Sequence, residues 1–131
     1  MNNDQAMNAY QHVGTTSAID SASPQRLVQM LLDGALESIA SAKGSVIRGE
    51  VALKGERIGK AISIVEGLRT SLNLEVGELS QNLEDLYDYV ARRLFEANMQ
   101  DDAEILDEVA GLLREMKSAW DVVTLETQQS A

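Results

Sequence analysis

The sequence predicts an all-α protein, an antiparallel up-down four-helix bundle preceded by a short N-terminal arm. Apolar residues recur at three- and four-residue steps through four segments of similar length, whereas the alternation typical of strands is nowhere sustained. Short connections separate these segments, and short connections favour antiparallel neighbours. With 131 residues, 44% of them hydrophobic, the chain is long enough for one domain with a core of its own.

Local signals mark both ends of the first helical segment. Ser23 precedes the sole proline, Pro24, and this pairing suits an N-cap followed by the first helical position. Gly49 provides a stop directly after Arg48. We therefore expect a helix from Pro24 to about Arg48, and we assign residues 1–22 to an arm that is flexible or holds one short helix.

Three further helices complete the expected bundle, which occupies residues 23–124. Their expected bounds are about Glu50 to Leu72, Gly77 or Glu78 to Asn98, and Asp101 to about Val123. Asp101 and Glu104 form a capping-box-like pair at the start of the last helix. Residues 125–131 show no apolar pattern, so we expect a frayed tail.

The first helix has an unusually wide apolar face. Its apolar arc covers about 180°, against the roughly 100° that a bundle face needs. The residues on this arc are Leu27, Val28, Leu31, Leu32, Ala35, Leu36, Ile39, Ala42 and Val46, with Met30 and Ile47 widening it. Either other helices surround this helix, or it leaves apolar surface for a partner to cover.

The second and third helices also carry apolar residues outside their main stripes. In the second helix, Ile62 belongs to the stripe expected to be buried, and Ile64 lies just beyond its edge. In the third, Tyr89 and Phe95 project away from the stripe and Tyr87 lies on its flank. These off-stripe residues are candidates for contact with a partner, although core positions remain an equal alternative for the aromatic ones.

The net charge of -10 lies entirely in the second half of the chain. Residues 1–74 carry seven acids and seven bases, whereas residues 75–131 carry fourteen acids and four bases. Such a surface repels phosphate backbones and anionic lipid headgroups, so nucleic acid is a poor candidate partner. No stretch approaches the roughly 20 uncharged apolar residues of a membrane span, so we expect no membrane insertion and a cytosolic location.

The residues needed for most catalytic and metal chemistry are missing from the expected bundle. The chain has no cysteine, and its sole histidine, His12, lies in the arm. A di-iron bundle needs Glu-x-x-His pairs, and a Ser-His-Asp triad would have to recruit that same histidine without a glycine-rich elbow. We therefore expect no metal, no cofactor and no enzymatic activity.

Gly55 and Gly59 form a small-xxx-small pair on the second helix. An interior glycine costs about 1 kcal/mol relative to alanine, so it calls for a packing reason. Close approach by a neighbouring or guest helix is one such reason, and tolerated variation at the surface is the alternative.

Several segments, taken together and in order, resemble the FliS family of flagellar export chaperones. They are Ala9-Tyr10, SPQRLVQMLLDGAL, AISIVEGLRTSLNLE, NLEDLYDYVARRLFEAN and REMKSAW, within about residues 7 to 123. The resemblance implies a cytosolic chaperone that binds the disordered C-terminal segment of flagellin. It further implies that such a protein prevents premature polymerisation and delivers flagellin to the flagellar type III export apparatus.

The resemblance also suggests roles for particular residues. It implies that the arm can cap the binding surface and that Tyr10, which matches the family's N-terminal tyrosine, tethers the arm or touches the guest. Leu32 departs from the tyrosine that is common there in the family, and only Gly77 marks a turn where many members carry two glycines.

A disordered guest can lay an amphipathic helix onto exposed apolar grooves, so the surplus apolar residues are the expected contacts. The expected partner-binding residues are Tyr10, Met30, Leu32, Leu36, Ile64, Tyr87, Tyr89 and Phe95. The alternative function is a generic helical adaptor or homo-oligomeric scaffold. In that case the apolar face of the first helix is a permanent subunit interface, for example in a homodimer.

Overall fold

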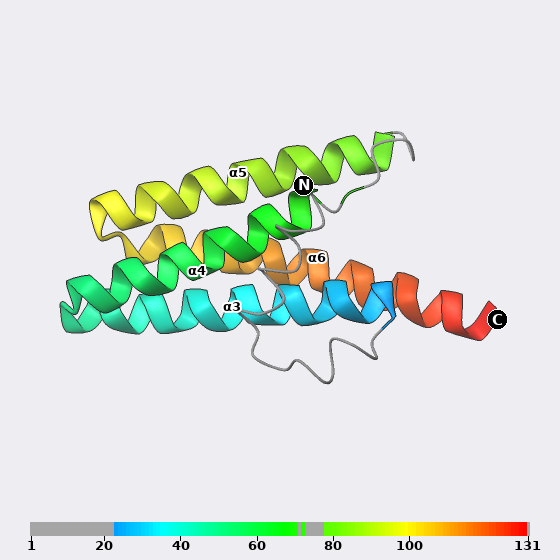
Figure 1. Ribbon diagram of the computed structural model, residues 1–131, viewed down its shortest axis with the longest axis horizontal. Helices are drawn as coiled ribbons and strands as arrows, with labels where there is room; N and C mark the ends of the chain where they lie inside the picture. Colours follow the sequence, from blue (N-terminus) through cyan, green and yellow to red (C-terminus); the bar gives the residue numbers. More distant parts are fainter. Residues whose placement is uncertain (1–22, 71, 73–77, 131) are drawn as a thin grey trace.

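The computed structural model describes residues 23–70, 72 and 78–130, and this part of the chain forms four α-helices and no strand. The helices are α3 (Pro24–Arg48), α4 (Val51–Thr70), α5 (Glu78–Gln100) and α6 (Ala103–Ser130). Successive helices run antiparallel to one another (Figure 1). Because α3 packs on α4 and α6, and α5 packs on the same two helices, the four close into a ring. The predicted all-α four-helix bundle is confirmed.

Both ends of α3 follow the local signals in the sequence. The Ser23 Oγ accepts a hydrogen bond from the backbone N–H of Arg26 at 3.2 Å, which satisfies one of the free donors of the first turn. At the other end Gly49 has a φ of 71°, and its N–H donates to the carbonyl of Val46 at 3.1 Å. Glycine adopts this left-handed conformation without steric cost, so the helix ends where predicted.

The connection between α5 and α6 differs from the expectation. Asp102, not Asp101, caps α6, because its Oδ1 accepts hydrogen bonds from the N–H groups of Glu104 at 2.9 Å and Ile105 at 3.4 Å. Asp101 instead has a φ of 51°, a conformation that aspartate tolerates better than most residues. The start of the helix is therefore displaced by one residue from the capping pair that the sequence suggested.

The helices also differ in length from the expectation. Helix α4 is shorter than expected at both ends, and α5 continues past Asn98 to Gln100. Helix α6 continues past the expected end at Val123 to Ser130, and its C-terminal part extends beyond the start of α3 (Figure 1).

A buried lysine fastens the start of α4 to the end of α5. The Lys54 side chain is only 8% exposed, and its Nζ donates to the backbone carbonyl of Asn98 at 2.9 Å. The same ammonium forms an ion pair with the Asp101 carboxylate. Because the last carbonyls of a helix lack partners within it and carry partial negative charge, this lysine satisfies the end of α5 and holds the α5–α6 connection in place.

The core explains the wide apolar arc of the first helix. With α4 on one side and α6 on the other, α3 buries side chains over a wider face than a helix with one neighbour. The largest fully buried side chains in the described part of the chain come from all four helices: Leu31, Leu32, Ile39, Ile58, Ile64, Leu94, Leu106 and Leu113. In this part of the chain no helix combines the length and the apolar character needed to cross a bilayer.

Candidate functional site

Most of the expected partner-binding residues on α3 and α4 lie inside the bundle. Met30, Leu32 and Ile64 are buried, and Leu36 is partly buried and packs against the core. A partner can reach the buried side chains only if the helices separate. Tyr10 lies outside the residues that the structure describes.

The two tyrosines of α5 are held within the bundle in different ways. Tyr87 is buried in the core, and burial raises the pKa of its phenol to about 12. Tyr89 is half-buried, and its hydroxyl donates to the Glu108 carboxylate of α6 at 2.5 Å. Arg93 Nε donates to the same carboxylate at 2.9 Å. Tyr89 is therefore part of the contact between α5 and α6.

The hydrogen bonds around Glu108 shift the pKa of Glu108 and the pKa of Tyr89 in opposite directions. The hydrogen bonds from Tyr89 and Arg93 lower the pKa of Glu108, since they stabilise its ionised form. The hydrogen bond to Glu108 raises the pKa of Tyr89, because donation requires the protonated phenol. Both groups are thus kept in the states that hold α5 and α6 together near neutral pH.

Phe95 is the expected partner-binding residue that the structure leaves most exposed, with 59% of its surface accessible. It lines a groove between α4 and α5 with a volume of about 390 Å³. The groove is formed by apolar Ile62, Ala91 and Phe95 and by charged Glu66, Asp88, Arg92 and Glu96. We call it the α4–α5 groove. An aromatic ring exposed beside other apolar side chains is the kind of anchor that protein partners use.

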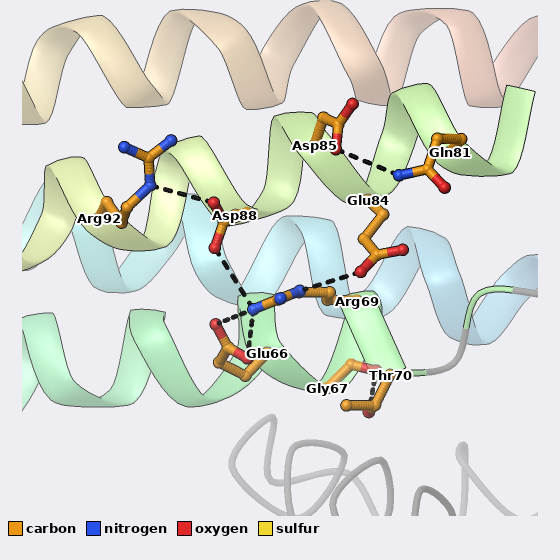
Figure 2. A network of polar contacts seen from close by, with 9 residues as sticks. All are labelled: Glu66, Gly67, Arg69, Thr70, Gln81, Glu84, Asp85, Asp88 and Arg92. Carbon is orange, nitrogen blue, oxygen red and sulfur yellow. Dashed lines mark hydrogen bonds and ion pairs between the residues drawn. The ribbon is translucent and has the colours of Figure 1, made fainter. Parts of the chain in front are cut away.

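A network of charged side chains lies at one end of the α4–α5 groove (Figure 2). Arg69 lies among three carboxylates, at 3.4 Å from Glu66, 3.8 Å from Glu84 and 3.5 Å from Asp88. Asp88 also accepts a hydrogen bond from Arg92 Nε at 3.0 Å. These contacts join α4 to α5 and give the groove a polar rim at this end.

Gly55 and Gly59 lie on the groove side of α4, at helical spacing from Ile62. Among the described residues, a Cβ atom at Gly59 would meet nothing within 4 Å, and one at Gly55 would meet only the Asn98 side chain at 3.9 Å. Close packing within this part of the bundle therefore does not require glycine at either position. A guest helix and tolerated surface variation remain as explanations.

Sequence reasoning missed most of the groove. Ile62 was expected in the core and Ile64 at its edge, but Ile64 is fully buried and Ile62 lines the groove. Helix α4 is the least amphipathic of the four helices, so its pattern alone does not identify its buried side. The usable signal was on α5, where Asp88, Arg92 and Phe95 share one face at three- and four-residue steps.

Comparison with known proteins gives a consistent result over nearly the whole chain. Residues 6–127 match the family described as flagellar protein FliS. The chain is 47% identical over 120 residues to the flagellar secretion chaperone FliSB of Pseudomonas aeruginosa, covering 91% of this chain and 95% of that protein. It is 39% identical over 122 residues to flagellar secretion chaperone FliS of Vibrio cholerae, covering 92% and 90% of the two chains. The FliS of Salmonella typhimurium is 45% identical over 114 residues, covering 86% and 84%.

Proposed function

The chain belongs to the FliS family of flagellar secretion chaperones, and on that premise we propose that its cargo is the disordered C-terminal segment of flagellin. Chaperoning is a non-enzymatic role, so the prediction that the chain is not an enzyme is confirmed by its family. Binding takes place in the cytosol and prevents premature polymerisation. The flagellar export apparatus then receives the cargo.

The observation that carries this proposal is the exposed Phe95 ring in the α4–α5 groove. A segment that folds on binding gives up conformational entropy, so it needs apolar contacts to offset that cost. Phe95 and Ile62 offer such contacts on the outside of the bundle, where a cargo helix can lie without opening the core. Tyr10 and partly buried Leu36 remain proposed contacts with the cargo. Tyr89 instead belongs to the contact between α5 and α6. The remaining expected contacts are part of the core: Met30, Leu32, Ile64 and Tyr87.

Calorimetric titration of the full-length protein with the C-terminal segment of flagellin from the same bacterium tests the proposal. We expect a saturable complex, and we expect Phe95→Ala to weaken it about tenfold, as truncation of an interface anchor does. The thermal unfolding of this variant should match that of the parent, because the ring is mostly exposed in the free protein.

Val122→Ala is a suitable control, because Val122 is 56% exposed and lies on α6, outside the groove lining. It should leave cargo affinity unchanged. No heat and no co-elution at roughly tens of micromolar cargo would exclude the proposed complex. Light scattering addresses the alternative: a stable oligomer that persists in excess cargo segment would favour a homo-oligomeric scaffold.

A further inference from the structure

The rim of the α4–α5 groove carries more negative than positive charge. Its own lining contains three carboxylates, from Glu66, Asp88 and Glu96, and one guanidinium, from Arg92. The wider network adds Glu84 as an acid and Arg69 and Arg93 as bases. Four carboxylates therefore share three guanidinium groups, and Arg93 also pairs with Glu108 of α6, so the rim keeps an excess of at least one negative charge.

The carboxylate at one end of the groove is only weakly engaged. Both Glu66 oxygens lie 3.4 Å from Arg69, longer than the roughly 2.7–2.9 Å of a strong charge-assisted hydrogen bond. Arg69 divides its charge between Glu66 and two carboxylates of α5 (Figure 2). Glu66 thus retains capacity to accept hydrogen bonds from a further cation.

Glu96 occupies the other end of the groove and also shares its cation. Its partner Arg93 lies 2.8 Å away and also donates to Glu108. The pairing of Arg69 with Glu84 and of Lys54 with Asn98 sets the antiparallel register of α4 and α5. With about 1.5 Å of rise per residue, that register places Glu66 and Glu96 on either side of Ile62, each about one or two turns away.

We propose that the α4–α5 groove selects a helical cargo segment in which an apolar anchor is flanked, about one turn away, by lysine or arginine. Glu66 and Glu96 are the residues that recognise this cation. The anchor contacts Ile62 and Phe95, and side chains three or four residues from it on the cargo helix reach the carboxylates. Glu66 and Glu96 are 32% and 44% exposed, so solvent screens them only in part. This inference rests on the proposed function and specifies the kind of segment that the site prefers.

The test uses two synthetic amphipathic peptides with the same apolar face, one with lysine and the other with glutamate at the flanking positions. We expect the full-length protein to bind the lysine peptide about tenfold more tightly. In the double variant Glu66→Gln and Glu96→Gln this preference should fall to about twofold, with a weaker dependence on salt. Arg69 and Arg93 keep other carboxylate partners in that variant, so its thermal unfolding should stay close to that of the parent.

The matched control is the double variant Glu37→Gln and Glu115→Gln, which changes the net charge equally at two exposed positions outside the groove. It should keep the full preference for lysine. Equal binding of both peptides to the parent overturns the inference, as does an undiminished preference in Glu66→Gln/Glu96→Gln. If the flagellin segment binds that variant as tightly as the parent, the inference fails and the proposed function stands. If the flagellin segment does not bind the parent, the proposed function itself fails.

Discussion

The α3–α6 and α4–α5 contacts lie on opposite sides of the helical ring, and they differ in what covers their middle parts. Polar contacts fasten both at each end. Between α3 and α6, the Trp120 Nε1 donates to the Gln25 carbonyl at 3.0 Å, and Lys43 pairs with Asp107 at 2.9 Å. Between α4 and α5, Arg69 pairs with Glu84 at one end, and Lys54 donates to the Asn98 carbonyl at the other.

On α3 and α6, partly buried apolar side chains pack against the core, among them Leu36, Leu112 and Met116. The middle of the α4–α5 contact is instead a groove with an exposed phenylalanine. The α4–α5 side therefore leaves an aromatic ring exposed outside the core, and it is on this side that we place the proposed binding site.

The largest expected effect is a difference in lost stability between alanine substitutions at two isoleucines of α4, Ile62 and Ile64. Ile64→Ala should lower the free energy of unfolding by about 3 kcal/mol, because it leaves a cavity in a fully buried site. Ile62→Ala should cost about 1 kcal/mol in stability, because that side chain lines the groove and is only partly buried, but it should weaken cargo binding. Urea denaturation and calorimetry measure the two quantities. Equal losses of stability in Ile64→Ala and Ile62→Ala would show that Ile62 does not lie on a separate, groove-lining side of α4.

A smaller effect is expected at the α3–α6 contact. Trp120→Phe removes the hydrogen bond to the Gln25 carbonyl and should lower the free energy of unfolding by about 1 kcal/mol. Urea denaturation followed by circular dichroism would measure this change. Cargo affinity should not change, and a several-fold loss of affinity at unchanged stability would place Trp120 in the binding site.

The smallest effect concerns the dependence of stability on pH. The lowered pKa of Glu108 means that its contribution to stability is present above its ordinary value of 4.5 and is lost as pH falls through the lower folded value. Glu108→Gln should therefore lose less stability than the parent when thermal unfolding is followed from pH 5 toward acid. Glu115→Gln, at an exposed position on the same helix, should keep the parental profile. An unchanged profile in Glu108→Gln would show that the contact with Tyr89 and Arg93 has no such effect.

The fold could be predicted from the sequence wherever a local signal decided the structure. Ser23, Pro24 and Gly49 define the ends of α3 through interactions within a few residues, so these ends are as expected. The sequence suggested Asp101 as the cap of α6, but Asp102 takes that position and Asp101 pairs with Lys54, which is distant in sequence. A contact between two helices cannot be predicted from the residue pattern of one helix alone.

The candidate site was less predictable for the same reason. The arc of α3 was wide enough for a binding face, but whether it is covered depends on the position of α6. Phe95 could be identified because it departs from the apolar stripe of α5. Glu66, which belongs to α4, becomes part of the same site only through the antiparallel register of the two helices.

The position of Trp120 provides a spectroscopic consequence, because it is the only tryptophan in the chain. Its indole reports on the α3–α6 contact, on the side of the ring opposite the α4–α5 groove. Cargo that docks on the outside of α4 and α5 should leave the emission maximum unchanged, whereas cargo that separates the helices should shift it to longer wavelength. Unlabelled protein therefore carries an intrinsic optical reporter that distinguishes docking on an intact bundle from insertion into an opened one.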